Sequence, residues 1–234
     1  MALAGGGGVF ELTQNPDGTW SESAVYNFTG GKDGGHPVTN LIFDAAGNLY
    51  GMTQGGGAHG NGVVFSLTPN PDGSWKESVL HAFTGGKDGA DGGEGLVFDT
   101  AGNLYGGTWY GGAYGYGVVY KLTPQSSGVW KETVLHAFTG GRDGANAGAT
   151  EFIFDSAGNL YSTTLSGGTH GYGVVYKLTP KSGGGWKETV LHAFNDKSGA
   201  NPAGGVIFDA VGNLYGTTGG DGSKTFGSVY EITP

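Results

Sequence analysis

The chain has no cysteine and few basic residues. Without cysteine, disulfides, thiolate nucleophiles and cysteine-bound zinc are excluded. Only 11 of the 234 residues are lysine or arginine, the net charge is −9, and the basic residues do not cluster. A groove that follows a phosphate backbone needs such a cluster. We therefore expect no nucleic-acid partner.

Long apolar runs are also missing. A membrane-spanning helix needs roughly 20 consecutive apolar residues, and no segment approaches that length, so we expect no membrane span. The first residues, "MALAGGGG", lack the charged stretch followed by an apolar stretch that marks a signal peptide. We expect no signal peptide within this chain.

A helical period is absent as well, whereas glycine is abundant. No segment repeats its apolar residues every 3.6 positions over the ten or more residues that a helix needs. Glycine fills 52 positions, roughly three times its usual share of about 7%. The 12 Tyr, 12 Phe and 5 Trp supply enough apolar surface to argue against disorder. The sequence predicts an all-β fold.

The chain repeats one unit of about 55 residues. Tryptophan recurs at spacings of 55, 55 and 56, at positions 20, 75, 130 and 186. One unit reads "LVFD", "NLYGGT", "VVYKLT" and "WKETVLHAF", over residues 96–138, and each segment alternates and is bounded by turn residues. The turn "DTAGN" between the first two places Asp99 to accept backbone N–H bonds and lets Gly102 take a positive φ. Each unit therefore predicts four antiparallel strands.

Four-stranded sheets at this period are typical of β-propeller blades. We predict a single β-propeller domain over residues 1–234 with four blades, each of four antiparallel strands and about 55 residues. The units are 41–83, 96–138, 152–194 and a fourth in which 206–234 closes with 7–28. Both faces of the strands carry apolar residues, as expected for sheets with a neighbour on each side.

The third strand occurs five times, once more than four blades need. Its first and last copies lie at the two ends of the sequence, "GVFELT" at 8–13 and "SVYEIT" at 228–233. We expect them to compete for one place at the closure of the ring. The losing strand would present a free edge, and free edges favour pairing with another molecule, so a homo-oligomer formed through terminal strands is one expectation.

The runs "GYGVVYKLTP", "KETVLHAFTGGRDGAN" and "FDSAGNLYSTT" resemble the GloVer tandem repeat of bacterial extracellular proteins. The hairpin "FDxxGNLY" is similar in phase to NHL-type propeller repeats. The resemblance covers nearly the whole chain. It implies a secreted or surface-anchored bacterial propeller and no defined activity.

Loops after the second and fourth strands are expected on one rim and hold most of the unusual residues. One column of the second-strand loops reads His59, Tyr114, His170 and Lys224, and the next reads Asn61, Tyr116, Tyr172 and Phe226. Glycine-lined aromatic pockets suit a sugar ring, but a residue repeated in every unit can also simply fill the gap between sheets. Trp109 and Tyr110 have no aromatic counterpart in the other units, so they are the strongest candidates for ligand stacking.

The fourth-strand loops carry carboxylates. Asp88, Asp91 and Glu94 form the best candidate calcium site. The competing interpretation is that Asp33, Asp88 and Asp143 satisfy backbone N–H groups in a turn. Apart from calcium, no cofactor is expected.

The histidines His81, His136 and His192 share a place inside the fourth strand, where the first unit has Tyr26. They are interpreted as buried hydrogen-bonding aromatics, and the four tryptophans as packing on the outer strand.

Three functions remain open. The first is a module that binds a glycan or cell-surface polymer, and the second is a structural, self-assembling protein. The third is a polysaccharide lyase or hydrolase that uses Glu94 and Glu151 near the central channel. Since nucleophile and metalloprotease motifs are missing, binding is preferred over catalysis.

Overall fold

The computed structural model describes residues 5–195, 199–220 and 226–233. Within these ranges the chain consists of β-strands and one 3₁₀ turn, η1 (Ala147–Ala149), with no α-helix. The all-β prediction is confirmed. None of the described segments is a helix long and apolar enough to cross a membrane.

The strands fall into five antiparallel sheets that follow the predicted repeat. A leading hairpin contains β1 (Gly8–Gln14) and β2 (Trp20–Asn27). Unit one contains β3 (Gly35–Pro37), β4 (Ile42–Phe43), β5 (Leu49–Gly55), β6 (Val63–Pro69) and β7 (Trp75–Ala82). Unit two contains β8 (Ala90–Phe98), β9 (Leu104–Tyr110), β10 (Val118–Pro124) and β11 (Trp130–Ala137). Unit three contains β12 (Ile153–Phe154), β13 (Leu160–Thr164), β14 (Val174–Pro180) and β15 (Trp186–Ala193). Unit four contains β16 (Val206–Phe208), β17 (Leu214–Thr218) and β18 (Ser228–Ile232).

The turn between the first and second strands forms as the sequence predicts. In unit two, Asp99 Oδ1 accepts hydrogen bonds from the backbone N–H of Ala101 and Asn103 at 2.9 Å each, and Gly102 has φ +80°. Asp99 Oδ2 accepts from the Tyr105 hydroxyl at 3.0 Å. The same aspartate network recurs at Asp44, Asp155 and Asp209. Each hairpin is therefore held by hydrogen bonds within its own unit and does not depend on contacts between units.

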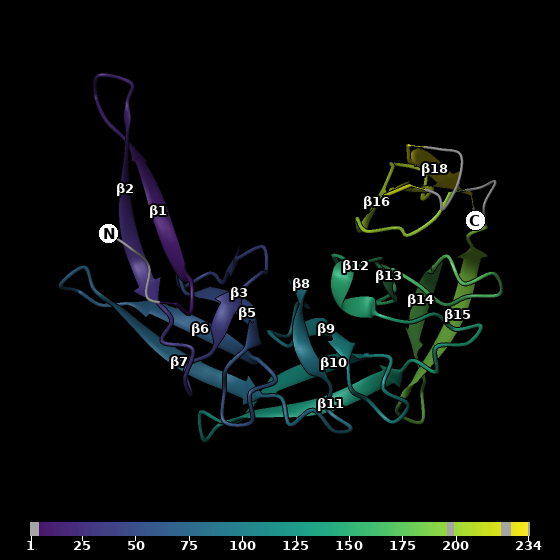
Figure 1. Cartoon of the computed structure of the whole chain (residues 1–234), viewed down its shortest axis with the longest axis horizontal. Coiled ribbons are helices and arrows are strands. Elements are labelled where there is room, and N and C mark those ends of the chain that lie inside the picture. Colours follow the sequence, from purple (N-terminus) through teal and green to yellow (C-terminus); the bar gives the residue numbers. More distant parts are fainter. Residues whose placement is uncertain (1–4, 196–198, 221–225, 234) are drawn as a thin grey trace.

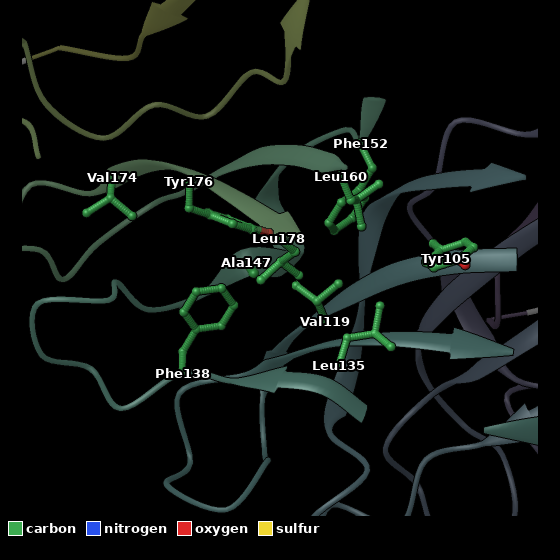
Figure 2. Close-up of a cluster of buried hydrophobic side chains, with 10 residues drawn as sticks. All are labelled: Tyr105, Val119, Leu135, Phe138, Ala147, Phe152, Leu160, Val174, Tyr176 and Leu178. Carbon is green, nitrogen blue, oxygen red and sulfur yellow. The ribbon is translucent and has the colours of Figure 1, made fainter. Parts of the chain in front are cut away.

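Apolar side chains on both faces of each sheet pack the units against one another. Figure 2 shows the cluster between units two and three. Tyr176 of β14 is fully buried, and its ring lies edge-on to Phe138, just after β11, with centroids 5.3 Å apart. Equivalent edge-on pairs join Phe83 to Tyr120 and Phe194 to Tyr230. The core is thus a series of layers between sheets rather than one central core.

The sheets succeed one another along an arc, with β7, β11 and β15 on its outer side (Figure 1). The hairpin β1–β2 and the sheet β16–β18 lie at opposite ends of that arc. Among the described residues, the expected closure of 206–234 with 7–28 is not seen: β18 pairs with β17 and β1 pairs with β2, in separate sheets. The two copies of the third strand therefore do not compete here, because each pairs with its neighbour in sequence, at a small loop-closure cost.

The layered core predicts a large cost for removing a ring between units. Phe138→Ala is expected to lower the free energy of unfolding by about 3–5 kcal/mol, because it leaves a cavity beside Tyr176. Chemical denaturation followed by circular dichroism measures this loss. The exposed Val129→Ala, in the turn after β10, serves as the control and should change stability by less than about 0.5 kcal/mol. Equal effects of the two variants would contradict the layered core.

Candidate ligand-binding rim

The second-strand loops and the fourth-strand loops form one continuous belt, as predicted. The backbone N–H of Gly112 donates to the Gly86 carbonyl at 2.8 Å, and that of Gly168 donates to Gly141 at 2.7 Å. Each bond joins the fourth-strand loop of one unit to the second-strand loop of the next. Backbone hydrogen bonds of this kind hold glycine-rich loops in a fixed shape.

A left-handed residue in each fourth-strand loop completes the belt. His36, Asp91, Asn146 and Asn201 have φ between 54° and 62°. Their N–H groups point back to the preceding loop; for example, Asn146 donates to the Tyr116 carbonyl at 2.9 Å. The Asn146 side chain also donates to the Trp109 carbonyl at 2.8 Å. Asn and Asp tolerate this backbone region better than most residues, which explains their place in the repeat.

Exposed tyrosines gather on the second-strand loop of unit two. Tyr110, Tyr114 and Tyr116 are 53%, 60% and 46% exposed. All three belong to residues 109–117, where Gly111, Gly112, Gly115 and Gly117 have positive φ. Large aromatic rings are costly to leave in water, so three of them on one ordered loop suit a surface that a ligand covers.

Trp109 and Tyr116 lie against glycines of the loop that follows the fourth strand of unit two. Trp109 is half-buried beside η1, where a Cβ added to Gly148 would lie 2.8 Å from the indole Cδ1. Its Nε1 is buried and has no hydrogen-bond partner. Tyr116 lies over Gly140, where an added Cβ would come within 2.6 Å of the ring. Trp109 and Tyr116 therefore each lie against a glycine of the following loop, whereas Tyr110 and Tyr114 are more than half exposed.

The remaining predicted binding residues are spread over two other units. His59 and His170 are exposed on the loops of units one and three. Tyr172 is half-buried and packs on the apolar cluster between units three and four, so it fills a gap between sheets as the competing interpretation held. Lys224 lies outside the described residues.

The aspartates of the fourth-strand loops are engaged in turns. Asp88 Oδ2 accepts from the Thr84 N–H at 2.9 Å and lies 3.2 Å from His81 Nε2, and its Oδ1 accepts from the Thr84 hydroxyl. Asp33 and Asp143 repeat this arrangement with Thr29 and Thr139. The turn interpretation is confirmed for these three carboxylates.

The candidate calcium residues do not converge. Asp91 occupies the left-handed position, and burial raises the pKa of its carboxyl. Glu94 is exposed on β8. In the part of the chain that the structure describes, no three His, Asp or Glu side chains form a group able to hold a metal ion. A calcium site here remains a prediction.

The histidines and tryptophans of the fourth strand largely pack as expected. His136 lies edge-on to Phe138 at 4.6 Å and 3.2 Å from Asp143, and burial lowers its pKa. Trp130 and Trp186 pack on the apolar layers. Trp20 differs, because it is 60% exposed.

At the inner ends of the units, Glu151 meets an asparagine rather than Glu94. Asn40 Nδ2 donates to Glu151 Oε1 at 2.5 Å, and the Asn40 N–H donates to the main-chain carbonyl of Glu94 at 3.1 Å. Asn40 and Glu151 occupy the same position of the repeat, in units one and three. In units two and four this position is Gly95 and Gly205, and both glycines lie against Glu151. The expected acid pair is therefore bridged by Asn40, which the repeat pattern did not identify.

A second feature that the sequence analysis missed is a half-buried glutamate in each of three fourth strands. Burial, with the nearby charge of an aspartate in the preceding unit's loop, raises the pKa of Glu77, Glu132 and Glu188 to about 7. In each of them Oε1 is buried without a hydrogen-bond partner. The sequence signal that could have identified these glutamates is the tripeptide "WKE", which is repeated in the three strands. Glu22, in the same place in β2, is exposed.

The sequence model of the Gloeobacter/Verrucomicrobia repeat matches residues 2–150 and, in a second overlapping match, 70–234. The chain belongs to this repeat family. The GloVer resemblance is thereby confirmed.

The fold also has a solved relative. A crystal structure of a protein of unknown function from Dyadobacter fermentans is 12% identical, with a TM-score of 0.52. The match covers 85% of this GloVer-repeat chain and 66% of the other chain, so this chain spans about two-thirds of the relative's length. That likeness concerns the fold alone. No curated protein matches the chain significantly.

The half-buried glutamates predict a pH effect on stability. Their pKa rises from 4.5 in the unfolded chain to about 7 in the folded chain. Between these values the folded state binds more protons, so the stability that they contribute is present below about pH 4.5 and is lost as pH rises through 7. The triple variant Glu77→Gln, Glu132→Gln, Glu188→Gln should therefore gain stability relative to the parent from pH 5 to pH 8.

Urea unfolding at both pH values measures this difference. Glu22→Gln is the matched control, since its side chain is exposed, and its stability relative to the parent should not change with pH. A triple variant that follows the parent at both pH values would show that the glutamates are solvated.

Proposed function

We propose that this chain is a secreted or surface-anchored bacterial binding module, built as a β-propeller, that binds a glycan or another cell-surface polymer on the rim of unit two. The observation that carries the proposal is the exposure of Tyr110 and Tyr114 beside Trp109 and Tyr116 on one ordered loop. Aromatic rings of this kind stack on the apolar faces of sugars. The extracellular location rests on the resemblance of the repeats to those of bacterial extracellular proteins.

The charge of the chain narrows the ligand class. With a net charge of −9, the protein repels polyanions at long range. A neutral polysaccharide therefore fits the tyrosine surface better than a uronic-acid or phosphate polymer does. Stacking without a charged partner gives weak single contacts, and a polymer offers several contacts at once.

The propeller arrangement is supported by the inner ends of the units. Asn40 of unit one and Glu151 of unit three are 111 positions apart, yet they share a hydrogen bond. Gly95 of unit two and Gly205 of unit four both lie against Glu151. Such convergence is expected where first strands surround one axis. An enzyme of the lyase or hydrolase class stays an untested hypothesis, because no described carboxylate pair is free at this point.

A glycan array followed by calorimetry with the best neutral polysaccharide tests the binding function. Tyr110→Ala with Tyr114→Ala should weaken binding by roughly 5- to 150-fold, because each of the two stacking contacts contributes about 0.5–1.5 kcal/mol. Tyr110→Phe with Tyr114→Phe should retain binding, since the ring is kept. Both positions are exposed, so the fold should be unaffected.

His59→Ala with His170→Ala is the matched control, because these residues occupy the place of Tyr114 in units one and three. This double variant should bind as the parent does. Absence of binding to every polymer on the array, or equal loss in the histidine control, would contradict a site on unit two.

A structural, self-assembling role is the second candidate function. The observation that favours it is that β1 and β18 each leave one edge without a partner strand among the described residues. Unpaired edges are common points of association.

A further inference from the structure

Among the described residues, unit four has three strands, whereas units one, two and three each have a further strand after the third. The third strands β6, β10 and β14 each pair with a fourth strand, and the register is the same in all three pairs. The last residue of each third strand is a proline that lies opposite a tryptophan, as Pro124 lies opposite Trp130. Among the described residues β18 pairs with β17 alone. Val229 lies on the face of the third strand that packs against the following unit in the other units. It is 77% exposed, whereas its counterparts Val64, Val119 and Val175 are fully buried.

A pocket lies where the tryptophan of the missing strand would pack. Between units one and two, Tyr50 meets Trp130 with ring centroids 6.3 Å apart, and between units two and three Tyr105 meets Trp186 at 6.1 Å. A pocket at this place between units two and three is lined by both Tyr105 and Trp186. Between units three and four, the counterpart Tyr161 lines the corresponding pocket, and no tryptophan is among the described residues that line it. The other residues around it include Leu191, Phe208, Leu214 and Ile232.

The chain contains one fourth strand whose tryptophan has no such pocket. β2 begins with Trp20, which is 60% exposed. It reads "WSESAVYNF", against "WKETVLHAF" in units two and three, so its tryptophan, glutamate and phenylalanine match in position. The strand that now pairs with β2 is β1, "GVFELT", which is closely similar to "SVYEIT" in β18. The register that joins Gln14 to Trp20 is therefore available to β18 as well.

We propose that β2 of a second copy of this chain leaves its own β1 and pairs with the vacant edge of β18. Its Trp20 then occupies the pocket beside Tyr161. This inference rests on the self-assembling function and names its contact surface. The exchange keeps the number of paired strands and buries Trp20. Val229 then takes the place of Val9, which is buried against unit one.

The geometry favours a second copy over the chain's own β2. In the structure β2 lies at the far end of the arc from β18 (Figure 1). It is held there by Phe28, which is fully buried and lies 4.9 Å from the Phe65 ring. A contact between the tail of one copy and the head of the next is heterologous, so it extends into larger assemblies or closes into a ring of several chains.

Light scattering after size-exclusion chromatography, over a range of concentrations, tests the proposal. The full chain should form oligomers whose mass rises with concentration. Trp20→Ala removes the head contact and Val229→Glu removes the tail contact, and both side chains are exposed in the single chain. Each variant alone should shift the midpoint of assembly at least tenfold higher in concentration. Val129→Glu, exposed in the turn after β10, should assemble as the parent does.

Mixing the two variants gives the sharpest result. Trp20→Ala retains an intact tail and Val229→Glu an intact head, so an equal mixture should form a dimer and nothing larger. Oligomers that persist in each single variant would overturn the exchange while leaving self-assembly in place, through pairing of another edge. A chain that stays monomeric at every concentration would overturn both self-assembly and the exchange, whereas polymer binding at unit two is measured separately.

Discussion

The structure depends on the apolar contact between one sheet and the next. No unit has a core of its own, because its buried residues lie on two faces that each need a neighbour. Tyr176 is enclosed only because Phe138 of the preceding unit lies edge-on to it. Where the neighbour is missing, the same residue types are exposed, as Trp20 and Val229 are at the two ends. Repeat proteins in general obtain their stability from such nearest-neighbour contacts.

The rim follows from this constraint. Since the sheets of units one to three are sandwiched between neighbours, the loops at the sheet ends are the surface on which units can differ without disturbing the core. The belt of backbone hydrogen bonds, such as Asn146 to Tyr116, keeps the loops in one shape. Unit two departs from its neighbours at Trp109 and Tyr110 while its strands stay the same. A binding function placed there uses a scaffold that already fixes the loop.

Sequence reasoning succeeded where structure is local. The Asp99 turn, the four-strand units and the shared rim all follow from residues within about 55 positions of one another. Asp88 was correctly interpreted as a turn residue for the same reason. The half-buried Glu132 was missed because its surroundings come from the neighbouring unit, and hydropathy gives no sign of a carboxyl enclosed between sheets. The contact of Asn40 with Glu151 joins two units that are not adjacent in sequence, so no repeat pattern reveals it. The behaviour of the ends was misjudged because β1 and β18 each found a partner next to them in the chain.

The central claim is that each unit is stable through its neighbours, and amide hydrogen exchange tests it most directly. At a concentration low enough to keep the chain monomeric, the amides of β9, β10 and β14, which lie between two neighbouring sheets, should be the slowest to exchange. Those of β1 and of β16–β18 should exchange much faster. Equal protection in all five sheets would contradict the account, because it would mean that each sheet is stable by itself.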